Sequence, residues 1–181
     1  RRRYAWGGQH AGVPVIGAGW ARMAGALTAV AGCLVSCGLD DGVRGPARAL
    51  VLEVIDGDTV VLDSGDRVRY LMVDAPEITN GHDDCFGARA ARFNADLVLG
   101  QTVELAYDVE RTDRFGRLLA YVTVGGTEVN SLLVERGYAC VLFIPPDGAA
   151  RRDQFEGLER AARKAGRGMW DIDVCGEVPC P

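Results

Sequence analysis

From residue 49 onward, the chain alternates short apolar segments with acidic, glycine-containing turns, and this alternation is the strongest constraint on its fold. Asp56-Gly57-Asp58 is one such turn, and Asp63-Ser64-Gly65-Asp66 is the next. Runs of β-branched and large apolar residues bounded by turn formers predict β-strands. Such runs occupy residues 50–55, 59–62, 67–73, 101–107 and 118–124. The first three of these runs predict a three-stranded meander.

Three other segments have the 3.6-residue apolar period of a helix, at residues 87–99, 129–136 and 149–165. Each is followed by a glycine that favours a helix stop: Gly100, Gly137 and Gly166. Strands first, with helices inserted and appended, predict a small β-barrel with helices, in the α+β class.

Charge is distributed unevenly along the chain. Residues 1–36 contain four arginines and no acid, so 16 of the 20 Lys+Arg remain against 25 Asp+Glu, a formal balance of −9. With 48% hydrophobic residues, a disordered chain is excluded. A protein that coats nucleic acid by net positive charge is excluded too, so any chemistry on nucleic acid must come from a local site.

The N-terminal segment predicts export. Arginines precede an apolar run that is short for a membrane span, which suits a signal peptide over residues 1–36. Residues 34–37, Leu-Val-Ser-Cys, resemble the lipobox of bacterial lipoprotein precursors, which implies lipidation at Cys37, a tether over residues 37–48 and a mature protein on the extracellular face of the membrane. An ordinary secretory signal or an uncleaved anchor are the alternatives.

Four cysteines follow the leader: Cys85, Cys140, Cys175 and Cys180. Outside the cytosol they admit three disulfide pairings, and we expect at least one bond between the Cys85 loop and the tail at 172–181. A zinc site is the competing interpretation, although no CxxC is present, and a free buried thiol is the alternative for Cys140.

Several carboxylates follow predicted strands. Asp56 and Asp58 flank one turn, and Asp74 and Glu77 follow the third strand, so a meander brings them to one rim of the sheet. Gathered carboxylates repel unless a cation lies between them, and hard oxygen ligands favour Ca²⁺ or Mg²⁺ over zinc. The alternative is ordinary turn chemistry.

Two arginines extend this hypothesis. Arg69 lies in the third predicted strand, and Arg117 closes a polar turn before another strand. A guanidinium binds phosphate through two parallel hydrogen bonds and stays charged, so two of them beside a cation predict a phosphodiester clamp. Ion pairs with neighbouring acids are the alternative role.

Three ordered motifs carry a resemblance: residues 54–60 (VIDGDTV), 68–77 (VRYLMVDAPE) and 111–121 (RTDRFGRLLAY). They resemble the staphylococcal nuclease-like family, and the likeness continues through Asn130, 134–139 and 165–170. The resemblance covers about residues 49–171. It implies an OB-type five-stranded β-barrel with about three helices, and Ca²⁺-dependent hydrolysis of DNA and RNA that leaves 3′-phosphate ends.

By this resemblance, four residues hold the metal. Asp58 and Asp74 match the carboxylate ligands of Ca²⁺, the main-chain carbonyl of Ala75 matches a further ligand, and Asp56 matches an acid that acts through water.

The resemblance also assigns the catalytic residues. Glu77 matches the proposed general base, and Arg69 and Arg117 match the phosphate-binding arginines. A catalytically silent OB-type nucleic-acid-binding lipoprotein is the alternative function, and a Ca²⁺-stabilised structural lipoprotein is a third.

The sequence departs from the family where aromatic residues meet the substrate. Phe115 and Phe143 stand where tyrosines are found, with Pro145 at a third such place. A phenyl ring stacks on a base but cannot donate to phosphate. We expect Arg114, Phe115 and Phe143 to bind substrate, and the protein to be a monomer.

Overall fold

The computed structural model describes residues 45–79, 81, 83–177 and 180. The predicted signal peptide, Cys37 and most of the predicted tether lie outside these residues. Within the described part of the chain, no helix has the length and apolar character needed to cross a membrane.

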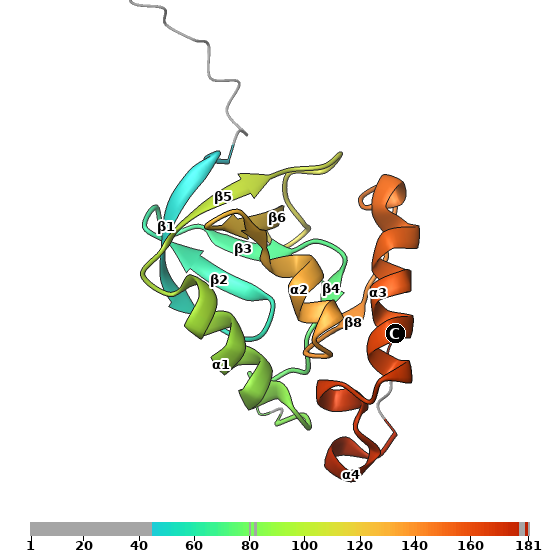
Figure 1. Cartoon of the computed structure of the whole chain (residues 1–181). Coiled ribbons are helices and arrows are strands. Elements are labelled where there is room, and N and C mark those ends of the chain that lie inside the picture. Colours follow the sequence, from blue (N-terminus) through green and yellow to red (C-terminus); the bar gives the residue numbers. More distant parts are fainter. Residues whose placement is uncertain (1–44, 80, 82, 178–179, 181) are drawn as a thin grey trace, which may run out of the picture. The chain divides into compact units, whose positions relative to one another are not determined.

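Five strands form a closed mixed barrel (Figure 1). Their order is β3-β2-β1-β5-β6 with antiparallel neighbours, and a parallel pairing of β3 with β6 closes the barrel. A short strand, β7, extends the sheet beyond β6. The bounds are β1 Arg48–Val54, β2 Thr59–Leu62, β3 Arg67–Tyr70, β5 Thr102–Ala106, β6 Leu118–Val124 and β7 Thr127–Glu128. The predicted OB-type five-stranded barrel is confirmed.

Three helices of seven or more residues accompany the barrel, as predicted: α1 Gly87–Val98, α2 Val129–Glu135 and α3 Arg152–Lys164. α1 packs against β1, while α2 lies between β6 and α3 (Figure 1). The third predicted helix is split, because its first residues form the 3₁₀ turn η1 (Ala149–Arg151). Two short elements follow α3 that were not predicted, η2 (Gly168–Trp170) and α4 (Ile172–Cys175).

The prediction of one strand over residues 67–73 is wrong. β3 ends at Tyr70, and a separate strand, β4 (Val73–Asp74), pairs with β8 (Cys140–Val141) outside the barrel. The break falls at Met72, whose φ of 63° lies in the left-handed region that an extended strand does not visit. The Arg69 guanidinium stabilises the bend by donating from Nη1 to the carbonyls of Tyr70 and Val73, at 3.1 and 2.5 Å.

Two buried asparagines tie this bend to the rest of the core. Asn130, on α2, donates from Nδ2 to the carbonyl of Leu71 at 2.9 Å and accepts from the Val122 amide at 2.8 Å. Asn94, on α1, accepts from the Tyr70 hydroxyl at 3.0 Å. Buried polar groups that are fully bonded specify a single arrangement, so the two helices fix the path of the chain after β3.

Two disulfides join the C-terminal tail to the body: Cys85–Cys175 and Cys140–Cys180, each with Cα atoms 5.7 Å apart. The expected bond between the Cys85 loop and the tail is confirmed. Cys140 is not a free thiol. Zinc binding by these cysteines is contradicted, because all four sulfurs are paired.

Candidate active site

The turn between β1 and β2 buries two carboxylates. Asp56 and Asp58 are only 8% and 4% exposed. Asp56 accepts a hydrogen bond from the Asp58 amide at 2.9 Å, the self-bonding that makes aspartate a turn former. Asp58 accepts from the Thr59 hydroxyl at 3.0 Å and, through Oδ2, from the Ala75 amide at 2.6 Å. The second contact attaches the β1–β2 turn to the segment that follows β4.

Arg69 connects this turn to Asp74. Its Nη1 lies 3.1 Å from Asp58 Oδ2, and its Nη2 lies 2.8 Å from Asp74 Oδ1. The Arg69 side chain is 13% exposed, so both ion pairs are shielded from water on one side. The structure therefore brings Asp58, Asp74 and Arg69 together.

The acids outnumber the positive charge beside them. Burial raises the pKa of Asp58 to about 7, with Asp56 and Asp74 adding to the rise and Arg69 opposing it. Burial also raises the pKa of Asp74, and the Glu77 carboxylate contributes. A single guanidinium does not compensate three neighbouring carboxylates, so the cluster favours an additional positive charge.

The donor chemistry fits a hard divalent cation. Asp58 and Asp74 offer carboxylate oxygens, and Ala75 adds a main-chain carbonyl in the same stretch of chain. Oxygen-only donors are the set that Ca²⁺ accepts most readily. Within the described residues, Asp56, Asp58 and Asp74 do not bring three carboxylate oxygens to within 4.8 Å of one another.

Glu77 and Asp74 line the same cavity of about 320 Å³. Three of the disulfide-bonded cysteines, Cys85, Cys140 and Cys175, also line it. Its Oε1 accepts from the Thr79 amide at 2.9 Å and from the Thr79 hydroxyl. Its own amide donates to Asp84 at 3.0 Å. The loop after Pro76 therefore holds the Glu77 carboxylate in a defined orientation near the acidic cluster.

Arg117 is held by an acid that the sequence reasoning did not single out, Asp113. Arg117 Nε lies 2.7 Å from Asp113 Oδ2, while Asp113 Oδ1 accepts from the amides of Phe115 and Arg117 at 2.9 and 3.0 Å. Partial burial alone would raise the pKa of Asp113, but these bonds from Arg117 and Phe115 hold it below its usual range. The sequence does contain a signal for this ion pair, because an aspartate precedes the arginine by four residues within one polar turn.

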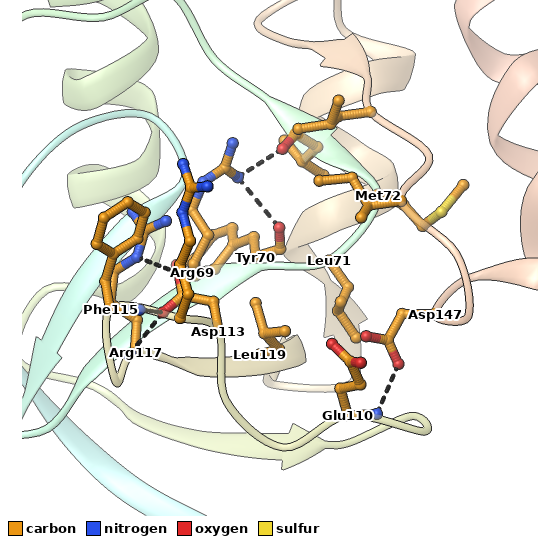
Figure 2. Close-up of a pocket in the computed structure, with 14 residues that line it drawn as sticks. Arg69, Tyr70, Leu71, Met72, Glu110, Asp113, Phe115, Arg117, Leu119 and Asp147 are labelled. Carbon is orange, nitrogen blue, oxygen red and sulfur yellow. Dashed lines mark hydrogen bonds and ion pairs between the residues drawn. The ribbon is translucent and has the colours of Figure 1, made fainter.

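Both arginines line one cavity of about 460 Å³ (Figure 2). Arg114 and Phe115 line it as well, and Phe115 is 69% exposed, with Arg114 over its ring at 4.7 Å. Phe143 does not line this cavity. It lies under the Arg152 guanidinium at 4.7 Å, and the neighbouring Ile144 faces the cavity.

The small mixed barrel with buried acids and two oriented arginines at its rim defines a protein of the staphylococcal nuclease class. The chain belongs to this family: residues 67–172 match the family model for staphylococcal nuclease homologues. It is 36% identical over 134 residues to a thermonuclease of Staphylococcus intermedius, covering 71% of this chain and 79% of that one.

Two other relatives have similar sequence identity to this chain. A thermonuclease of Staphylococcus hyicus is 32% identical over 125 residues, covering 66% of this chain and 73% of its own length. The endonuclease YncB of Bacillus subtilis is 38% identical over 123 residues, which is 64% of this chain and 58% of that protein. The chain thus spans less than two thirds of YncB.

Proposed function

We propose that this chain is a Ca²⁺-dependent nuclease that hydrolyses phosphodiester bonds of DNA and RNA, cleaving the bond to the 5′ oxygen and leaving 3′-phosphate ends. One observation carries the proposal: Arg69 bridges Asp58 and Asp74 and lines the same cavity as Arg117. The names of the relatives, thermonuclease and endonuclease, support the same activity.

Asp58, Asp74 and the carbonyl of Ala75 would hold the cation, with Asp56 acting through water. When bound, Ca²⁺ supplies positive charge to a phosphate oxygen and lowers the cost of the charge that develops in the transition state. The Asp58 carboxylate is preorganised to bind a cation, because contacts with Thr59, Ala75 and Arg69 hold it in place.

The two arginines would bind the other phosphate oxygens. Each guanidinium is already oriented, Arg69 by Asp58 and Asp74 and Arg117 by Asp113, so little side-chain entropy is lost when phosphate binds. Donors fixed in advance around developing negative charge are a large contribution to catalysis.

Glu77 would act as general base. The oxygen of the attacking water forms a bond to phosphorus as the bond from phosphorus to the 5′ oxygen breaks. Glu77 accepts the proton from that water, and the 5′ oxygen leaves as a hydroxyl after it takes a proton from solvent water. The phosphate remains on the 3′ side.

The location is also proposed: the chain would be secreted or held on the extracellular face of the membrane through a lipid at Cys37. The two disulfides support an oxidising compartment, because such bonds are rare where thiols are kept reduced. The monomeric state stays a prediction. Mass spectrometry of the mature N-terminus from an expressing cell would test the lipid anchor.

The activity is tested by incubating the full chain with single-stranded DNA and with RNA, in Ca²⁺ and in excess chelator. Cleavage in Ca²⁺ alone is expected, and Arg117→Ala should reduce kcat by about 10²-fold, as loss of one transition-state donor does. Arg160→Ala is the matched control, since Arg160 is an exposed arginine on α3.

The alternatives give different results. A silent binding module would retain DNA in a mobility-shift assay without cleaving it. A structural Ca²⁺ lipoprotein would neither cleave DNA nor respond to Arg117→Ala. The proposal is wrong if a correctly folded chain shows no chelator-sensitive cleavage.

A further inference from the structure

The cavity that contains the arginines has opposite charges at its two sides. Arg69 and Arg117 lie together with Phe115, while Glu110 and Asp147 lie on the other side, and Leu71 and Leu119 are between them (Figure 2). A volume of about 460 Å³ is of the size that small-molecule sites occupy. A ligand with one anionic end and one hydrogen-bond-donating end would match this polarity.

Asp147 is a buried residue that lines the cavity and is held in place by a hydrogen bond. It is 4% exposed, and its Oδ1 accepts from the Glu110 amide at 2.9 Å. Within the described residues, no protein group donates a hydrogen bond to its Oδ2. The backbone next to Asp147 is also held in place, because the amide of Gly148 donates to the Asp108 carboxylate at 2.7 Å.

Glu110 adds a second acceptor at the same place. Its side chain is exposed and lines the cavity, and among the residues that the structure describes its carboxylate has no ion-pair partner. Two carboxylates on one side of the cavity attract hydrogen-bond donors and repel phosphate, so they orient a bound nucleotide with its phosphate toward the arginines.

We propose that Glu110 and Asp147 make the cavity select nucleotides whose base carries an exocyclic amino group. This inference rests on the proposed nuclease function. An ionised carboxylate only accepts hydrogen bonds, and the amino groups of cytosine, adenine and guanine donate. Where cytosine and adenine present their amino groups, thymine and uracil present the C4 carbonyl, which a carboxylate repels, so their remaining donor is the single N3–H of the ring.

The effect has a definite scale. A good base contact discriminates by a factor of about 5 to 150, and the exposure of Glu110 to water favours the lower end. We therefore expect kcat/KM for oligo(dC) and oligo(dA) to exceed that for oligo(dT) of equal length by about fivefold or more.

The first test compares these three substrates with the full chain and with Glu110→Gln. The glutamine amide can donate to the thymine carbonyl, so the preference over oligo(dT) should fall toward one. Glu104→Gln is the matched control, because Glu104 is an exposed acid on β5 that pairs with Arg48. Equal kcat/KM for the three wild-type reactions, or an unchanged ratio in Glu110→Gln, would overturn the inference.

A second measurement separates this inference from the nuclease proposal. Affinities of dCMP and dTMP for the full chain in Ca²⁺, measured by calorimetry, report the cavity without any cleavage. Tighter dCMP binding that Glu110→Gln abolishes supports the selection even if no substrate is cut. Equal affinities refute it even if the chain is an active nuclease.

Discussion

Asn130 is the residue whose removal most directly tests how the bend after β3 is held. Its side chain is fully buried and makes three hydrogen bonds, accepting from the Val122 amide at 2.8 Å and donating to the carbonyls of Leu71 and Ala120 at 2.9 and 3.2 Å. Asn130→Ala removes all three bonds at once and introduces no new polar group.

The expected cost follows from the groups that are left behind. The Ala120 carbonyl keeps a partner, because it also accepts from the Leu71 amide at 3.0 Å. The Val122 amide and the Leu71 carbonyl lose their side-chain partner in a dry core, at about 1 to 3 kcal/mol each. We expect Asn130→Ala to lower the free energy of unfolding by about 3 to 5 kcal/mol, a large share of the total for a domain of this size.

Urea unfolding followed by far-UV circular dichroism measures this difference. Asn94→Ala is the matched comparison, because Asn94 is equally buried but makes two bonds, with the Tyr70 hydroxyl at 3.0 Å and the Asp56 carbonyl at 3.2 Å. It also leaves two groups without their partner, so by the same reasoning its expected cost is about 2 to 6 kcal/mol. If Asn130→Ala costs less than about 1 kcal/mol, the hydrogen bonds do not hold the bend as described.

Three further perturbations have clear expected outcomes. Replacing Cys85 and Cys175 by serine opens a crosslink that spans 90 residues, and the thermal unfolding midpoint should fall by an amount equivalent to about 4 to 5 kcal/mol; no fall would show that the bond adds no stability. Without bound metal, in the presence of a chelator, Asp58 has a pKa of about 7 in the folded chain and about 3.8 in the unfolded chain. The folded chain therefore binds the additional proton between these two pH values, and its stability falls as the pH rises from about 3.8 to about 7. The urea midpoint should therefore fall between about pH 4 and pH 7 more in wild type than in Asp58→Asn, and equal slopes would refute this. Gly57→Ala should reduce both stability and nuclease turnover, since the added Cβ would overlap the Cβ of Ala75; unchanged unfolding and turnover would contradict that packing.

The motif residues made much of the site predictable from sequence. Asp56 and Asp58 lie in the turn between β1 and β2, which period and turn chemistry predict. Asp74 lies in β4, and Arg69 connects it to Asp58. The break at Met72 was not predictable, because residues 67–73 satisfy strand propensity throughout. What interrupts them is a bend held by Asn130 from α2 and by Arg69, and no local pattern encodes contacts over 59 residues.

The sequence also gave no means to choose among the functional aromatic positions. Phe143 and Ile144 are adjacent and both apolar, and which of them faces the cavity is decided by how the chain leaves β8. Asp113 was missed for another reason: an acid in a polar turn usually faces solvent, and only its contact with Arg117 distinguishes it.

The positions of the cysteines have a consequence for the order in which the molecule becomes crosslinked. Cys85 and Cys140 are synthesised 90 and 40 residues before their partners. Until translation has passed Cys175 and Cys180, the loop that carries Glu77 and the strand paired with Asp74 are held by noncovalent contacts alone. A chain interrupted before these two cysteines leaves Cys85 and Cys140 without their partners, so it has two more unpaired thiols than a completed molecule.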